Sequence, residues 1–150
     1  MIRAELRPDF TGLWKVDLEK SIIRGPAPKE ILVRIEHREP TLIQQVLVTT
    51  ASGKEQRQAF TCDSGTETTN SVSGVVIRTR ARWEGVDLVI ESWIETGGRE
   101  SYFKDHWSLS GDGGTLTMTH RDDDLAGQIS VLEKAPQVDK TRFDGLKSSN

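Results

Sequence analysis

The chain has 150 residues, and its 20 Lys and Arg against 23 Asp and Glu give a formal net charge of -3. This charge provides no overall basic field that could hold a phosphate backbone, so we expect no nucleic-acid partner. A chain of this length can bury a core without disulfides or a structural metal. We therefore expect one domain over residues 1–150, with polar and loosely held flanks at 1–9 and 134–150.

Sequence features of membrane, metal and secreted proteins are missing. The one cysteine, Cys62, can form no disulfide within the chain, and no Cys and His motif has the spacing of a zinc site. No apolar run approaches the roughly 20 residues that span a bilayer, and the first residues lack the apolar region of a signal peptide. The acidic run Asp122-Asp123-Asp124 lacks the EF-hand pattern. We expect a cytoplasmic protein with no membrane association, no metal and no cofactor.

Segments in which apolar and polar residues alternate recur along the chain, and each ends at a turn signal. Threonine is twice as frequent as alanine (14 against 7), and no proline occurs from Thr41 to Ala135, which favours long paired strands. In chain order, the expected strands are residues 11–17, 30–37, 42–50, 55–62, 66–70, 75–83, 88–95, 99–109, 115–121 and 128–133.

The turns predict which residues face each other, because side chains alternate between the two faces of a strand. A turn centred on Gly97-Gly98 places Ile90 opposite Asp105. A turn centred on Asp112-Gly113 places His120 opposite the same aspartate. These registers predict one largely apolar inner face with Ile77, Thr79, Ala81, Trp83, Leu88, Ile90, Ser92, Ile94, Ser101, Phe103, Asp105, Trp107, Leu109, Leu116, Met118 and His120.

The opposite face carries a ladder of opposing charges, in which Glu91 lies between Arg80 and Lys104 on the neighbouring strands. Such pairs contribute a few tenths of a kcal/mol each and are typical of a sheet face in water. On the same face, Trp93 opposite Tyr102 is either a homodimer contact or a simple cross-strand pair. The other residues that we expect on this solvated face are Arg78, Arg82 and His106.

The turn at Pro40 places His37 opposite Leu42 and Ile35 opposite Gln44, again on an apolar face with two polar members. Since no helix-length amphipathic segment can cover a sheet, so many strands must close on themselves or stack. We predict an all-β fold: an antiparallel up-and-down β-barrel of about eight to ten strands in meander order. A two-sheet sandwich with a solid core is the alternative.

The segment Phe10-Thr11-Gly12-Leu13-Trp14-Lys15-Val16-Asp17 resembles the G-x-W opening of the calycins, which include the lipocalins and fatty-acid-binding proteins. The order of WKVDLEKS, GPAPKE and WSLSGDGGTLTM is similar to that of small bacterial lipocalin-like proteins, over residues 10–133. The resemblance implies that Trp14 plugs the closed end of a barrel that binds a small, mostly apolar molecule.

Three features depart from the family patterns. Residues 18–29 are too few for the helical pair of fatty-acid-binding proteins, and the last strand lacks their Arg-x-Tyr carboxylate clamp. The arginine that stacks on the plug tryptophan of lipocalins has two candidates here, Arg121 and Arg142.

The strongest candidate for a binding or catalytic site is Asp105 facing His120 on the apolar inner face. An enclosed carboxylate that accepts a hydrogen bond from an imidazole selects its tautomer and raises its basicity. If the pair is enclosed in this way, it is a binding or catalytic dyad. The structural alternative is a buried pair that is hydrogen-bonded without a function, or a pair at an open rim in water.

Other polar residues on the inner faces could bind a polar ligand group or ordered water, namely His37, Gln44, Thr79, Ser92 and Ser101. Trp83, Ile90, Phe103, Trp107 and Met118 are expected to contact the apolar body of a ligand. A serine hydrolase is not expected, since no GxSxG nucleophile elbow occurs. Cys62 is expected to be a structural thiol, because no basic residue is its near neighbour in sequence.

The leading hypothesis is a barrel that binds a small hydrophobic or amphipathic molecule, with Asp105, His120 or His37 at its polar group. The alternative is a cofactor-independent isomerase, cyclase or lyase in which Asp105 and His120 act as an acid/base pair. A third hypothesis is a structural or oligomeric module with a solid core. An internal cavity of several hundred Å³ would separate the first two hypotheses from the third.

Overall fold

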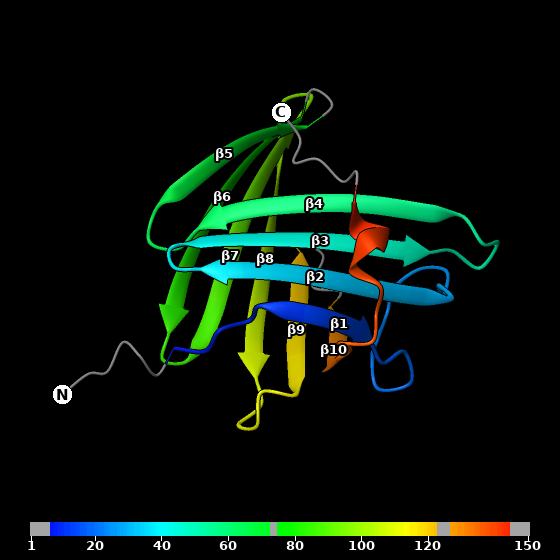
Figure 1. Cartoon of the computed structure of the whole chain (residues 1–150). Helices are drawn as coiled ribbons and strands as arrows, with labels where there is room; N and C mark the ends of the chain where they lie inside the picture. The colour runs from blue at the N-terminus through cyan, green and yellow to red at the C-terminus, as the bar shows by residue number, and fades with distance from the viewer. Residues whose placement is uncertain (1–6, 73–74, 123–126, 145–150) are drawn as a thin grey trace.

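The computed structural model describes residues 7–72, 75–122 and 127–144. Ten strands form one antiparallel sheet in the order β4-β3-β2-β1-β10-β9-β8-β7-β6-β5 (Figure 1). The strands are β1 (Gly12–Val16), β2 (Glu30–Arg38), β3 (Thr41–Thr49), β4 (Glu55–Asp63), β5 (Glu67–Val72), β6 (Val75–Glu84), β7 (Asp87–Thr96), β8 (Arg99–Leu109), β9 (Thr115–Asp122) and β10 (Gln128–Lys134). A short 3-10 helix, η2 (Lys140–Phe143), follows the last strand.

The sheet curls into a barrel because its first strand pairs with its last. Trp14 on β1 lies opposite Lys134 on β10, so the meander closes on itself there. Strands β4 and β5 form the two edges of the sheet and meet near their shared turn, where Ser64 bridges to Ala81. In Figure 1, β2, β3 and β4 run across β7, β8 and β9, which lie behind them. The predicted barrel and its meander order are therefore confirmed.

The predicted registers are also confirmed. Ile90 lies opposite Asp105, and Asp105 lies opposite His120, so the two hairpins bring these three side chains to the same level of the inner face. The first hairpin pairs His37 with Leu42, as the turn at Pro40 predicts. Because tight turns leave little freedom in strand pairing, sequence alone determines these registers.

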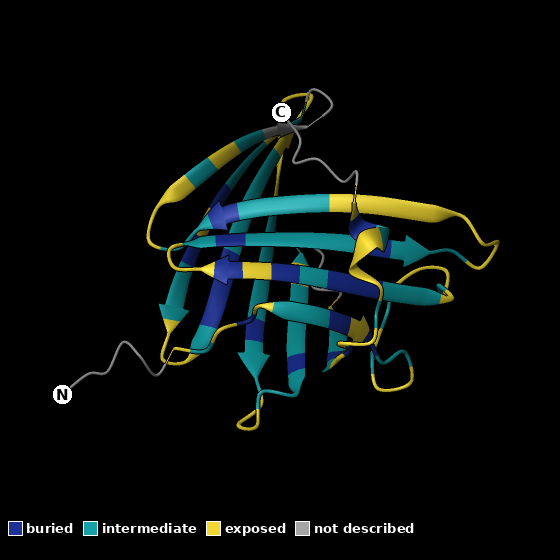
Figure 2. Ribbon diagram, in the orientation of Figure 1, coloured by how far each residue is buried: buried dark blue, intermediate teal, exposed yellow. Residues whose placement is uncertain are grey.

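The core lies inside the barrel, and Figure 2 shows its buried residues as dark bands along the strands. It includes large side chains from distant strands, among them Trp14, Ile35, Ile90, Trp107 and Leu132. One end of β4 is exposed, from Glu55 to Gln58, and the other end is buried at Cys62. Among the residues that the structure describes, no helix is long and apolar enough to cross a membrane.

The outer face carries the predicted charges, and Glu91 forms its hydrogen bonds with side chains other than that of Arg80. Glu91 accepts hydrogen bonds from Arg82 and from the Tyr102 hydroxyl, not from Arg80. On the neighbouring strand, Arg82 lies two residues from Arg80, which is directly opposite Glu91, and such diagonal pairs are within reach of long side chains. The Trp93 ring contacts Tyr102 at a centroid distance of 5.6 Å. The predictions that Glu91 points outward and lies between Arg80 and Lys104 are confirmed, while its hydrogen-bond partners were not predicted.

The polar C-terminal flank is held more firmly than expected as far as residue 144. Phe143 on η2 is only 1% exposed and packs on Leu32 and Leu47 outside the barrel. Arg142 bonds both Glu30 and Glu55 at 3.2 Å. One aromatic residue in a polar segment shows no periodicity, so the sequence gives no sign of this contact. Residues 1–6 and 145–150 lie outside the described part of the chain, as do Asp123 and Asp124.

Candidate ligand-binding cavity

A cavity of about 370 Å³ lies inside the barrel, between the β3–β4 hairpin and strands β6 to β9. Its floor is apolar, since Ile90 and Trp107 are both buried. The lining residues are Gln44, Gln58, Phe60, Ile77, Ile90, Ser92, Ile94, Phe103, Asp105, Trp107, Met118 and His120. The cavity opens toward solvent on the side where Gln58 is exposed. An apolar pocket with a few polar groups is typical of a small-molecule site.

Asp105 and His120 form a hydrogen-bonded pair in the wall of this cavity. Nδ1 of His120 lies 2.7 Å from Oδ1 of Asp105, and the two side chains are 38% and 28% exposed. The hydrogen bond to Asp105 raises the pKa of His120, while partial burial of the imidazole opposes the shift. The Phe103 ring stacks on the imidazole at a centroid distance of 5.4 Å, which holds its orientation.

A second ion pair lies close to His120. Arg24, in the segment between β1 and β2, bonds Asp122 of β9 at 3.1 Å. The charge of Asp122 adds to the rise in the His120 pKa, and the charge of Arg24 opposes it. Arg24 was not predicted at this site, because residues 17–29 have no periodicity that would place them against the barrel.

Four residues that were predicted to contact a ligand lie outside the cavity lining. His37 and Trp83 pack at one end of the barrel, and Thr79 is buried with no hydrogen-bond partner for its hydroxyl among the described residues. Ser101 is exposed near the β7–β8 turn. Their assignment to the inner face did not give their level along the barrel axis, so their place outside this lining was not predicted, and their contact with a ligand stays a prediction. Gln44, Ile90, Ser92, Phe103, Trp107 and Met118 do line the cavity, with Asp105 and His120.

Four lining residues were not among the predicted ligand contacts, and two of them come from β4. Phe60 lies opposite Gln44 in the β3–β4 hairpin. Gln58 comes two residues before Phe60 and lies on the same face. A turn centred on Ser52-Gly53 would pair Gln44 with Thr61, one residue away from the observed partner, so this turn signal alone did not place Phe60 on the inner face. The other two, Ile77 and Ile94, lie on the predicted inner face.

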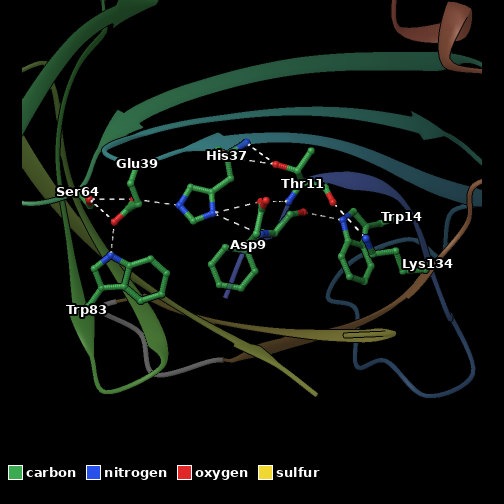
Figure 3. Close-up of polar contacts among 9 residues, drawn as sticks. Asp9, Thr11, Trp14, His37, Glu39, Ser64, Trp83 and Lys134 are labelled. Carbon is green, nitrogen blue, oxygen red and sulfur yellow. Dashed lines mark hydrogen bonds and ion pairs between the residues drawn. The ribbon is translucent and has the colours of Figure 1, made fainter. Parts of the chain in front are cut away.

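The end of the barrel nearest His37 is closed by the N-terminal segment (Figure 3). Phe10 is fully buried and its ring stacks on His37 at 5.4 Å and on Trp83 at 5.9 Å. The Phe10 N–H donates to Nδ1 of His37, so the neutral imidazole carries its proton on Nε2 and donates to Glu39 at 2.9 Å. His37 therefore links the N-terminal segment to Glu39 at this end of the barrel.

Trp14 is buried with no exposed surface, as the family resemblance predicts. Its indole N–H donates to the Phe10 carbonyl at 3.0 Å. The cation over its ring is Lys134, with Nζ 5.0 Å from the centroid. Both predicted candidates for this cation were wrong: Arg142 bonds Glu30 and Glu55 outside the barrel, and Arg121 faces Lys104 on the outer side of β8 and β9.

The contribution of Glu39 to the stability of the closed end depends on pH, and this dependence can be tested. Burial raises the pKa of this carboxyl, but hydrogen bonds from His37, Trp83 and Ser64 outweigh burial and lower it below its ordinary 4.5. A group with a lowered pKa stabilises the fold above its unfolded pKa, and this contribution is lost as pH falls through the folded pKa. Glu39→Gln should therefore cost about 1 kcal/mol or less at pH 7, since the site is partly exposed, and less at pH 3.

Urea unfolding at the two pH values measures this difference. The control is Glu36→Gln on β2, which removes an exposed bond to Arg34 and should change the free energy of unfolding at pH 7 less than Glu39→Gln does. An equal cost of Glu39→Gln at pH 7 and pH 3 would contradict this account of the closed end.

Two further hollows lie on the outer surface. The larger one, of about 840 Å³, runs along β1, β2 and β3 and is bordered by Leu13, Arg34, Glu36 and Lys140. The smaller one, of about 370 Å³, is lined by Lys104, His106, Thr119 and Arg121. Both grooves have a larger share of polar and charged lining than the barrel cavity, which is also open to solvent but has mainly apolar walls. No cluster of His, Cys, Asp and Glu within the described ranges could hold a metal ion.

No protein-family model matches this sequence, and no curated protein matches it. Solved structures match across most of the chain. An abundant heat soluble (SAHS) protein from Ramazzottius varieornatus, crystallised from a dimer sample, has 13% identity and a TM-score of 0.63 over 87% of this chain and 98% of its own. A point mutant of the fluorescent protein UnaG has 16% identity and a TM-score of 0.59, covering 89% and 99%. A Schistosoma mansoni fatty acid binding protein in complex with arachidonic acid has 14% identity and a TM-score of 0.58, covering 84% and 96%.

The chain has the calycin β-barrel fold. The barrel fold that the calycin resemblance implies is thus confirmed, while the family relationship, the lipocalin branch and a bacterial origin stay predictions. Between β1 and β2, this calycin barrel has turns and a bridge from Ile22 to Ile129, in agreement with the expectation that residues 18–29 are too few for a helical pair.

Proposed function

We propose that this calycin barrel binds one small, mostly apolar molecule in its internal cavity. The observation that carries the proposal is a cavity of about 370 Å³ whose floor is formed by Ile90 and Trp107. Ligand pockets have volumes of about 300 to 1,000 Å³ and are lined mainly by apolar and aromatic side chains with a few polar groups. The similar fatty acid binding protein, which holds arachidonic acid, supports the proposal.

The cavity argues against the alternative of a structural module with a solid core, because such a core has few voids larger than a water molecule. The outer aromatic pair fits a cross-strand contact, since Tyr102 bonds Glu91 and Arg78 lies 5.4 Å from the Trp93 ring centroid. Because one similar structure came from a dimer sample, a homodimer is the second expectation, which the mass of the protein in solution tests.

Catalysis without a cofactor is the second candidate function, favoured by the pair of Asp105 and His120. Its 2.7 Å contact lies in a partly desolvated site beside an apolar floor, and the raised pKa of His120 suits a general base near neutral pH. Conversion of a bound molecule, followed by product analysis, separates this function from binding alone.

We also propose a reducing, cytoplasmic location. It is supported by Cys62, a free and buried thiol whose pKa burial raises to about 12. Such a thiol is a structural residue and not a reactive one.

The binding proposal is tested with 2-methylnaphthalene, an apolar molecule of a size that suits the cavity. We expect saturable binding to one site, followed by calorimetry and by the fluorescence of Trp107 in the cavity wall. Ser92→Phe places a ring in the cavity and should weaken binding at least tenfold. Thr119→Phe, which adds the same ring opposite His106 on the outer face, should leave binding unchanged.

Weakening of equal size by both variants would contradict the placement of the site. The proposed function fails if neither this probe nor any molecule carried by the protein purified from its own host, as seen by native mass spectrometry, occupies the barrel.

A further inference from the structure

We infer that the natural ligand carries an acidic O–H group, a carboxylic acid or a phenol on an aromatic body, and that this group binds Nε2 of His120. The inference rests on the proposed binding function and specifies the chemical class of the ligand.

The first step is the geometry of the imidazole. Nδ1 of His120 is occupied by Asp105, so Nε2, the ring nitrogen farther from the backbone, is left for a ligand. Nε2 has no hydrogen-bond partner among the described residues, although the side chain lines the cavity and is only 38% exposed. Stacking on Phe103 prevents free rotation of the ring. A fixed imidazole with one unoccupied nitrogen in an apolar cavity is a recognition group for one polar atom.

The second step is the charge around His120. The charged groups that face it are Asp105 on β8, Asp122 on β9, and Arg24 in the segment between β1 and β2. Arg24 and Asp122 pair with each other, which leaves Asp105 as the uncompensated neighbour of the imidazole. Both carboxylates favour the protonated imidazolium. A protonated amine at Nε2 would oppose that protonation, whereas an anionic oxygen would favour it.

The third step is the proton balance. An acidic O–H transfers its proton to Nε2, while the N–H at Nδ1 stays with Asp105. The product is an imidazolium between the carboxylate of Asp105 and the ligand oxyanion, with no change in the total number of protons. A carboxylic acid that is already ionised in water reaches the same state when the site takes up one proton from the solution.

The fourth step is the size and shape of the cavity. A volume of about 370 Å³ holds about a dozen water-sized groups at roughly 30 Å³ each, which corresponds to a ligand of about a dozen non-hydrogen atoms. The rings of Phe60, Phe103 and Trp107 line this space and favour a planar aromatic body. Gln44 and Gln58, on the β3–β4 hairpin, offer amide groups to a second polar atom of the ligand.

The test uses three probes that share the naphthalene body of the apolar probe: 2-naphthoic acid, 2-naphthalenemethanol and 2-naphthylmethylamine. We expect the acid to bind wild-type protein at least tenfold more tightly than the alcohol or the amine at pH 7. Calorimetry in two buffers of different ionisation enthalpy should show net proton uptake with the acid and none with the alcohol.

His120→Gln should abolish the proton uptake and the preference for the acid, and leave the affinity for the alcohol within about threefold. His106→Gln is the matched control, because His106 makes a similar bond to Asp87 on the outer face, at 2.8 Å, and should leave both readouts unchanged. The comparison of probes on wild-type protein does not depend on the folding of any variant.

Equal or tighter binding of the alcohol or the amine, or acid binding without proton uptake, would overturn the inference. So would the absence of binding by all three probes. If 2-methylnaphthalene still binds in any of these cases, the proposed function stands and only the acidic class of the ligand is wrong.

Discussion

Replacing Trp14 by Ala is expected to lower the free energy of unfolding by about 3–5 kcal/mol, as truncation of large buried aromatic residues does. The side chain has no exposed surface, so its removal leaves a cavity between the strands that it joins. The Phe10 carbonyl would also lose the indole N–H at 3.0 Å, and Lys134 would lose the ring beneath its ammonium group. Urea unfolding followed by far-UV circular dichroism measures the change without depending on tryptophan fluorescence.

Trp93→Ala is the control for this prediction. Trp93 lies on the outer face, is only partly buried and contacts Tyr102, so its removal should cost about 0.5–1.5 kcal/mol. A loss of less than about 1 kcal/mol for Trp14→Ala, or equal losses for both variants, would show that Trp14 does not hold the plugged end together.

Asp105→Asn is expected to weaken binding of an acidic aromatic ligand by about ten- to a hundredfold, or about 1.5–3 kcal/mol for loss of a charge-assisted hydrogen bond. The substitution keeps the volume of the side chain and removes the charge that favours the imidazolium of His120. The pKa of His120 should fall, because its bond to Asp105 is the main cause of the rise. Titration with 2-naphthoic acid and the pH dependence of its affinity measure both effects.

The matched control is Asp87→Asn, which removes the same kind of charge from a histidine on the outer face, at 2.8 Å from His106. It should leave ligand affinity unchanged. A purely structural role of Asp105 predicts the opposite result, in which the melting temperature falls and the folded protein binds as wild type does. That outcome would show that Asp105 and His120 do not take part in ligand binding.

The strands were predictable because alternation and turns are local signals. Every strand in the structure begins and ends within two residues of its predicted range, and the expected pairing of Asp105 with His120 is correct. The hydrogen bonds of Glu91 were not predictable, for a reason of side-chain length: the register correctly places Arg80 opposite Glu91, but Arg82 reaches diagonally across the strands.

The candidate site was only partly predictable. Register gave the inner face and most of the cavity wall, including Ile90, Trp107 and Met118. It could not give the level of a residue along the barrel axis, and for this reason it did not show that His37 and Trp83 pack at the closed end, outside the cavity lining. The position of Phe10 between their rings decides this, and no local pattern shows where an N-terminal segment will turn.

The sequence by itself determined the all-β class, the meander, the face of each strand and the contact of Asp105 with His120, because each depends on residues joined by one turn or on a period of two. The tertiary structure alone decided where the barrel is plugged, which cation covers Trp14, how Arg24 and Asp122 approach His120, and that Phe143 packs outside the barrel. These contacts join residues far apart in the chain, such as Trp14 and Lys134, and form only when β1 pairs with β10. Closure of the sheet brings them together, and no periodicity or turn in the sequence encodes that geometry.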